Sequence, residues 1–363
     1  MDALDDVDAL PGTTQQMLDR MLATVLFTDI VGSTETAAAL GDVAWAACHY
    51  ADWTGDRAFL AGPGRPLVTE TARYWAARCT SDPDGRAHLR HVIGPDEYHE
   101  DVDDNAFTNV LARWNLRRAA GLEPPSAESA HWLRLADALV DGYDPGTGRH
   151  EQFTGFSDLE PLLAADLGTP PLAADLLLGP RVSRTQVVKQ PDVLMAHHLV
   201  PDELPVGSLA ADLDHYLPRT AHGSSLSPAI AASLLARAGR PDEAMPLFDI
   251  ALRMDLDDLT GMTASGLHLA TLGGVWQALL TGFAGVRVHA GTLLVDPHLP
   301  GRWGSLTLRF RCLGQTVELQ LHADSARVTA SGALPMGTPA SPPHAASREV
   351  CLARVDDTWV VSR

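Results

Sequence analysis

The middle of the chain carries apolar residues at helical spacing almost throughout, from Val43 to about Phe283. Apolar positions that recur every three to four residues are typical of amphipathic helices. Two connections, residues 81–105 and 142–189, are much longer than the usual roughly 4–6 residues, which marks them as functional loops or disordered segments. The predicted helices are residues 43–52, 66–79, 106–120, 127–141, 190–199, 228–238, 241–254 and 266–283.

The pattern differs on either side of this helical region. Residues 24–34 are rich in residues that favour β-strands and have Gly and Ser near their end, and the helix-like ETAAALGD follows them. After residue 286, apolar and polar positions alternate between turn signals, which predicts a small antiparallel sheet. The expected parts are an N-terminal segment (1–42), a helical region (43–285), a β domain (286–330), a Pro/Ala/Ser-rich linker (331–347) and a terminal strand (348–363).

The charge of the chain limits its partners. There are 27 basic and 46 acidic side chains, and the net charge is −19. Such a balance without a basic stripe argues against a nucleic acid and against an anionic membrane surface. The most apolar stretch, Leu267 to Val286, contains Gln277 and several glycines, so we interpret it as a buried core helix and not as a membrane span.

The cysteines and the N-terminus indicate a reduced, cytoplasmic setting. Four cysteines lie far apart without a CxxC pair, which fits neither a zinc site nor a disulfide framework. The N-terminal residues MDALDDVDALPG are acidic and have no apolar signal core. No HExxH, GxSxG or Walker pattern is present. We therefore expect neither a metal nor an organic cofactor.

Lys189 is the only lysine of the chain, against 26 arginines. In a chain that otherwise uses arginine for every basic side chain, a surface lysine would be expected to have been replaced by arginine. Lys189 is therefore predicted to act as a point charge that the planar guanidinium of arginine cannot replace. The alternative is chance survival.

Six carboxylates fall within nine residues of the acidic loop, residues 93–105, which Gly-Pro introduces. Like-charge crowding raises the pKa of at least one member, as a general acid near neutral pH requires. A calcium loop is excluded because Ala106 and Ala112 stand where Gly and Glu are needed. A solvated cap, in which Asp103 or Asp104 opens the next helix, remains an equal alternative.

A serine-rich segment, residues 219–228, precedes the helix that Ser227 and Pro228 begin. Backbone amides at a helix N-terminus, with hydroxyls beside them, suit an anion. An ordinary Ser-Pro cap is the alternative. His268 opens an apolar helix, where a hydrogen-bonded core histidine is more common than a ligand.

Four ordered blocks between Val43 and about Ala330 resemble glycoside hydrolase family 65, the inverting phosphorylases of maltose, trehalose and kojibiose. The blocks are VIGPDEYHEDVDDNAFTN (92–109), KQPDVLM (189–195), PRTAHGSSLSPAI (218–230) and TASGLHLATLGG (263–274). The resemblance covers the C-terminal half of the family. It implies a mainly α fold, the latter half of an (α/α)6 barrel followed by a small C-terminal antiparallel β domain. The family's N-terminal β-sandwich, first half of the barrel and FWDTE-type segment have no counterpart.

The resemblance also implies roles for single residues. Protonated Glu97 would donate to the glycosidic oxygen while phosphate attacks the anomeric carbon from the opposite face. The products would be β-glucose 1-phosphate and a free sugar, so the partners would be a disaccharide and inorganic phosphate as co-substrate. Family members are often homodimers. The implied assignments are Glu97 as general acid, Lys189 and Gln190 as sugar contacts, and Ser224, Ser225 and His268 as phosphate contacts.

A shorter resemblance lies at the N-terminus. TVLFTDIVGSTETAAALGD (24–42) is similar to the opening of a class III nucleotide cyclase domain, in which Asp29 would match a metal-binding aspartate. The second metal aspartate has no counterpart, so cyclase activity is not expected. The change near Asp42–Val43 suggests a gene fusion or rearrangement. The alternatives to a phosphorylase are therefore an inactive fragment, a phosphate-stimulated trehalase-type hydrolase, and a nucleotide-binding signalling module.

Overall fold

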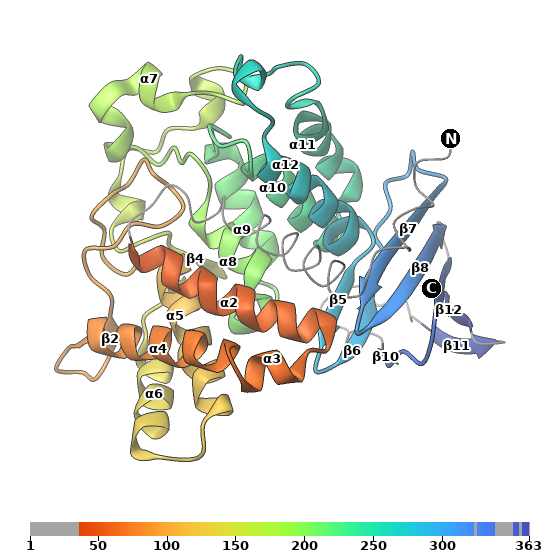
Figure 1. The fold of residues 1–363 in the computed structure, drawn as a ribbon. Helices are drawn as coiled ribbons and strands as arrows, with labels where there is room; N and C mark the ends of the chain where they lie inside the picture. The colour runs from red at the N-terminus through yellow and green to blue at the C-terminus, as the bar shows by residue number, and fades with distance from the viewer. Residues whose placement is uncertain (1–35, 323–324, 338–350, 356–357, 363) are drawn as a thin grey trace.

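The protein consists of a helical part and a β part that lie side by side (Figure 1). The computed structural model describes residues 36–322, 325–337, 351–355 and 358–362. This arrangement agrees with the expected mainly α fold followed by a small C-terminal β domain. The expected strand and turn at 24–34, and Asp29 within it, lie outside the described residues.

Each predicted helix has a counterpart, and the bounds differ by at most three residues, except that the first described helix begins seven residues before its expected start at residue 43. Among the described residues the structure adds α3, α7 and α9, which lie in stretches that the apolar pattern left as connections. The helices are α2 (Thr36–Thr54), α3 (Arg57–Ala61), α4 (Gly64–Arg78), α5 (Ala106–Leu122), α6 (Ala127–Ala138), α7 (Ala174–Leu178), α8 (Asp192–Leu199), α9 (Ser208–Tyr216), α10 (Ser227–Arg237), α11 (Pro241–Arg253) and α12 (Leu269–Gln277), which a π-helical turn (Ala278–Phe283) continues.

Helix α10 lies at the centre of the helical part and is buried along almost its whole length. Its sequence, SPAIAASLLAR, is rich in alanine, which allows neighbouring helices to approach closely. Gly274 of α12 faces Ala229 so closely that a Cβ at Gly274 would lie 3.0 Å from the Ala229 methyl group. Beside α10, the rings of Phe248, Phe283 and Trp303 pack with centroids 4.8–5.9 Å apart.

The β part contains a three-stranded and a five-stranded sheet. Their orders are β10-β6-β5 and β11-β12-β9-β8-β7, and neighbours are antiparallel except for the β10–β6 pair. In β7 and β8, alternate residues are buried, and side chains from both sheets share one apolar core with the π-helical turn. The strands are β5 (Val286–His289), β6 (Thr292–Val295), β7 (Ser305–Cys312), β8 (Gln315–His322), β9 (Ser325–Ala330), β10 (Met336–Gly337), β11 (Cys351–Val355) and β12 (Thr358–Ser362). Short hairpins occur at β1 (Thr80–Ser81) with β2 (Ala87–His88), and at β3 (Tyr143–Asp144) with β4 (Arg149–His150).

Trp53 near the end of α2 joins the helical part to the β part. Its indole Nε1 donates to the carbonyl of Arg311 at 2.7 Å, and the amide of Leu313 donates to the carbonyl of Trp53 at 2.8 Å. The indole also packs against Phe310 at a centroid distance of 6.0 Å. The earliest described helix is therefore bound to strand β7, far along the chain (Figure 1).

Three details differ from the sequence predictions. Residues 336–337 of the expected linker form β10, because their backbone pairs with the edge of β6. The expected single terminal strand is a hairpin of β11 and β12. The expected buried helix over 267–286 has one exposed side, since the exposed side chains of Leu269, Leu272 and Trp276 recur at intervals of three and four on α12.

Within the part of the chain that the structure describes, no helix is both long and apolar enough to cross a membrane.

The ring cluster gives a test of the core. Replacing fully buried Phe283 by alanine should lower the free energy of unfolding by about 3–5 kcal/mol, because the lost ring leaves a cavity between Phe248 and Trp303. Urea unfolding followed by circular dichroism measures this loss. The control Leu256→Ala removes a side chain that is 84% exposed and should change stability by at most about 0.5 kcal/mol. Equal effects of the two substitutions would contradict the described core.

Candidate active site

The acidic loop is closed at its base by backbone hydrogen bonds. The amides and carbonyls of Val92 and Val102 bond to each other in both directions at 2.9 Å, and the amide of Asp104 donates to the carbonyl of Leu89 at 2.8 Å. Pairing at the base and a Gly-Pro turn at the start leave the segment from Asp96 to His99 at the tip. The loop therefore presents Glu97 from a fixed base.

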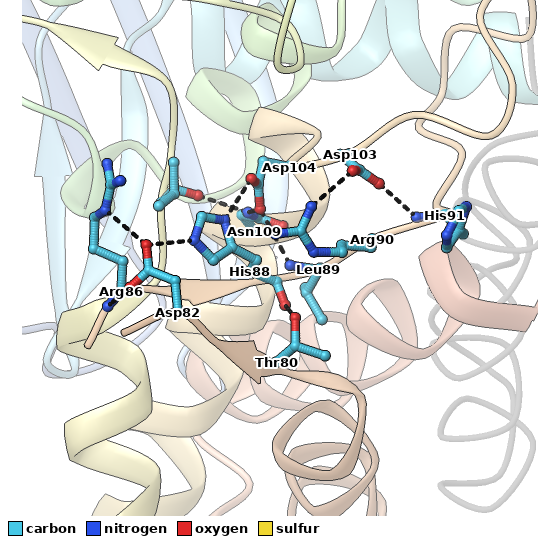
Figure 2. Close-up of polar contacts among 11 residues, drawn as sticks. Thr80, Asp82, Arg86, His88, Leu89, Arg90, His91, Asp103, Asp104 and Asn109 are labelled. Carbon is cyan, nitrogen blue, oxygen red and sulfur yellow. Dashed lines mark hydrogen bonds and ion pairs between the residues drawn. The ribbon is translucent and has the colours of Figure 1, made fainter. Parts of the chain in front are cut away.

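A buried histidine strengthens this base (Figure 2). His88 Nδ1 lies 2.7 Å from Asp104 Oδ2, and His88 Nε2 lies 3.4 Å from Asp82 Oδ2. The hydrogen bond with Asp104 is the main cause that raises the pKa of His88. The other oxygen of Asp104 accepts from Asn109 Nδ2 at 3.1 Å and from the amide of Leu89 at 3.2 Å. One buried carboxylate thus joins the hairpin, the loop and helix α5.

At the tip of the loop, Asp96 points inward and is buried. Its Oδ1 accepts from the amide of Lys189 at 2.8 Å. Its Oδ2 accepts from Gln152 Nε2 at 2.9 Å and lies 2.7 Å from His99 Nδ1. These bonds connect the loop to two segments that come much later in the sequence.

Asp192, at the start of α8, lies behind Asp96. Its Oδ1 accepts from the amide of Asp96 at 2.7 Å, and its Oδ2 accepts from Asn105 Nδ2 at 2.6 Å. Burial, followed by the charge of Asp96, raises the pKa of Asp192 well above its usual value. Gly94 is required here because a Cβ would lie 2.1 Å from Asp192 Oδ2.

Glu97 and Lys189 meet beside a pocket of about 380 Å³. Lys189 Nζ lies 2.7 Å from Glu97 Oε2, and both side chains are partly exposed. Gln190 lies next to them, and its Nε2 donates to the carbonyl of Pro95 at 2.6 Å. The structure therefore brings the predicted acid and the predicted sugar contacts together. The pocket is lined by Glu97, Tyr98, Glu100, Asp175, Val182, Ser183 and Lys189.

The serine-rich segment runs beside Lys189. The amide of Val188 donates to the carbonyl of Arg219 at 3.0 Å, and the amide of Ala221 donates to the carbonyl of Val188 at 2.8 Å. Gly223 follows beside two of the residues that line the pocket, since a Cβ at Gly223 would lie 2.8 Å from the Tyr98 hydroxyl and 3.4 Å from Lys189 Cγ. The second and third sequence blocks are thus adjacent in space.

His222 makes the turn into the helix in a left-handed conformation, with φ of 52°. Burial lowers its pKa to about 4, so the ring is neutral near pH 7. Its Nδ1 lies 2.9 Å from the hydroxyl of Ser227, which in turn donates to the carbonyl of Ser224 at 3.2 Å. These bonds order the turn that carries the two serines.

The predicted phosphate contacts lie on this turn and on the start of α12. The hydroxyl of Thr271 donates to the carbonyl of Ser225 at 3.0 Å, which joins the two elements. His268 precedes α12, and its Nδ1 lies 2.6 Å from Asp255 Oδ1. Ser224, Ser225 and His268 are partly exposed and are not among the residues that line the pocket at Glu97.

The structure corrects the expectation about the acidic cluster. Neither Asp103 nor Asp104 caps α5, because Asn105 Oδ1 accepts from the amide of Thr108 at 3.0 Å and is the N-cap. The six carboxylates do not crowd together: Asp96 and Asp104 turn inward, whereas others face solvent. The carboxyl of this site whose pKa is raised belongs to Asp192, outside the loop.

One other buried group consists of residue types that can bind a metal ion. Its members, His150, His197 and Asp212, offer ligand atoms within 4.8 Å of one another. Asp212 Oδ2, however, lies 2.9 Å from His150 Nδ1 and 2.8 Å from His197 Nε2. These are hydrogen-bond distances, and ligands about 2.0–2.2 Å from a tetrahedral ion would stand farther apart. We therefore interpret the group as a hydrogen-bond network of the core.

Comparisons with known proteins agree with the sequence blocks. The central catalytic domain of glycosyl hydrolase family 65 matches residues 18–277, and the C-terminal domain of that family matches residues 286–337. The first match begins 25 residues before the expected start at Val43 and takes in residues 24–42, so the cyclase-like resemblance of that segment stays a prediction.

Similar proteins include several phosphorylases. The kojibiose phosphorylase of Halothermothrix orenii is 30% identical over 309 residues, which cover 79% of this chain and 40% of that protein. The α,α-trehalose phosphorylase of Geobacillus stearothermophilus is 32% identical, with the same two shares of 79% and 40%. A solved structure of a proposed kojibiose phosphorylase from the human microbiome has a TM-score of 0.75 and 25% identity, over 83% of this chain and 43% of its own. The chain thus spans about 40% of the length of the curated relatives that it matches.

The base of the acidic loop gives a test in solution. A raised pKa means that protonated His88 stabilises the folded state below its ordinary pKa of about 6.5, and that this contribution is lost as the pH rises through the raised value. The free energy of unfolding of the wild type should therefore exceed that of His88→Gln most at pH 6 and least at pH 9. Urea unfolding at both pH values measures the difference. A gap that stays constant or widens with pH would contradict the described His88–Asp104 contact.

Proposed function

The chain belongs to glycosyl hydrolase family 65, and from this premise we propose that it takes part in the phosphorolysis of an α-glucoside disaccharide of the trehalose, maltose or kojibiose type. The products would be β-glucose 1-phosphate and a free sugar. The observation that carries the proposal is the contact between Glu97 and the only lysine of the chain at the edge of a pocket.

Glu97 would act as the general acid. To donate to the glycosidic oxygen its carboxyl has to carry a proton, and a protonated carboxyl is a poor partner for an ammonium group. We therefore propose that Lys189 leaves Glu97 and contacts sugar hydroxyls when a disaccharide binds, with Gln190 beside it. The 2.7 Å contact would then describe the pocket before the substrate enters.

Phosphate would bind near Ser224, Ser225 and His268. The two serines precede the N-terminus of α10, where backbone amides point outward and favour an anion. An inverting hydrolase needs a second carboxylate to activate water. In a phosphorylase the anion itself is the nucleophile, so one carboxylic acid is enough.

The setting and the partners are part of the same proposal. Cys48, Cys79 and Cys312 are free thiols, which supports the expected cytoplasmic location. The partners would be a disaccharide and inorganic phosphate, and the resemblance leaves the oligomeric state open, since family members are often dimers. A hydrolase of the trehalase type and an inactive chain are the competing functions, and their products distinguish them.

The proposal is tested by incubating the purified chain with phosphate and, in turn, trehalose, maltose, kojibiose and nigerose. One of these should release β-glucose 1-phosphate, detected by proton and phosphorus NMR. Glu97→Gln should lower kcat by about 10²–10⁴-fold because the proton donor is lost. The matched control Asp101→Asn changes an exposed carboxylate of the same loop and should retain activity.

Three outcomes separate the alternatives in this experiment. β-Glucose 1-phosphate that appears only with phosphate supports the proposal. Free glucose as the only product would indicate a hydrolase. The absence of any product from a folded chain would indicate an inactive protein and would overturn the proposed activity.

A further inference from the structure

Two buried carboxyl groups stand directly behind the contact between Glu97 and Lys189. Asp96 and Asp192 are each about 1% exposed, and neither lines the pocket. Buried carboxyl groups are costly unless they make specific hydrogen bonds. Their position so close to the proposed acid suggests a role in the site.

Asp96 is tied to both partners of that contact. It precedes Glu97 in the chain, so its backbone sets the direction in which the Glu97 side chain leaves the loop. Its Oδ1 accepts the amide hydrogen of Lys189 at 2.8 Å, so it also fixes the backbone from which the lysine side chain leaves. The position of Asp96 therefore fixes the backbone from which both side chains extend.

Asp96 is itself held from several directions. Its amide donates to Asp192 Oδ1 at 2.7 Å, and Gln152 bridges the two residues, since it donates to Asp96 Oδ2 at 2.9 Å and accepts from the amide of Asp192 at 3.1 Å. His99, 2.7 Å from Asp96 Oδ2, reaches the carbonyl of Thr185 with its other nitrogen at 2.9 Å. A shift of Asp96 would break several of these buried bonds at once and leave buried donors and acceptors without partners.

We propose that Asp96 is a positioning residue, whose buried carboxylate places Glu97 and Lys189 so that the acid can reach the leaving oxygen of a bound glycoside. Asp192 and Gln152 hold Asp96 in that place. Asp96 touches neither substrate nor the reacting atoms. This inference rests on the proposed function, but its geometric part does not depend on activity.

The single lysine allows a direct test of the geometry. In protein labelled only with [15N]lysine, one backbone amide signal is expected, that of Lys189. Asp96→Ala removes the acceptor of this amide, so the proton signal should move upfield. Asp101→Ala, in the same loop but exposed, should leave it in place. Asp96→Asn keeps one oxygen for the converging donors and gives a milder variant, should Asp96→Ala not fold. An unchanged signal in folded Asp96→Ala would overturn the proposal, and where only Asp96→Asn folds, the second test decides.

A second test asks whether Asp96 places Glu97 correctly, and it does so by changing the leaving group of the substrate. α-Glucosyl fluoride reacts with phosphate to give β-glucose 1-phosphate and fluoride, and fluoride departs without a proton from the protein. Asp96→Ala should lower kcat on the disaccharide by about 10²-fold, as expected for a misplaced acid, and on the fluoride by less than about tenfold. The same pattern is expected of Glu97→Gln, whereas Asp101→Ala should leave both rates unchanged.

The two tests keep the failures apart. Equal losses on both substrates would show that Asp96 only maintains the fold of the pocket and would overturn the positioning role. If the wild-type protein forms no β-glucose 1-phosphate from either substrate, the proposed function is wrong. In that case the amide signal still decides whether Asp96 positions Lys189.

Discussion

The bond between the amide of Asp96 and the carboxyl of Asp192 is the contact on which the rest of the site depends, because it joins segments that are 96 residues apart. Two neighbouring buried carboxylates would repel each other in a medium of low polarity. Burial, followed by the charge of Asp96, raises the pKa of Asp192, and the donors around the pair offset the cost of placing the two groups side by side. Around it, Gln152 and Asn105 complete the hydrogen bonds, and the proposed acid is held without any direct contact to these groups.

Much of the helical part could be predicted from the period of apolar residues, since α10 and α11 bury side chains that are apolar at nearly every inward position. Helix α9 could not, because two of its buried positions are Ser208 and Asp212. Polar side chains that find partners inside the protein leave no trace in an apolar pattern. The same holds for the exposed side of α12, where apolar residues face outward.

The candidate site was only partly accessible from the sequence. The count of lysines pointed to Lys189, and the resemblance pointed to Glu97 within a crowded loop. Nothing in the sequence indicated Gln152, which lies 56 residues from Asp96 in a long connection and acts through its amide group. Local charge counting also overestimated repulsion, because it assumes that neighbours in sequence share the same surroundings. Folding instead gives each carboxylate of the loop its own partners.

The hydrogen bond between the Trp53 indole and strand β7 also has a consequence for synthesis of the chain. Helix α2 leaves the ribosome before strand β7, because the carbonyl that its indole bonds belongs to Arg311, 258 residues later. At about 5–20 residues per second, the helix waits roughly 13–52 s for this partner. Contacts of such long range also slow folding, because a large loop must close before the contact can form. During this time the Trp53 indole lacks its partner on β7, and a nascent chain stalled before β7 would be a natural substrate for a chaperone.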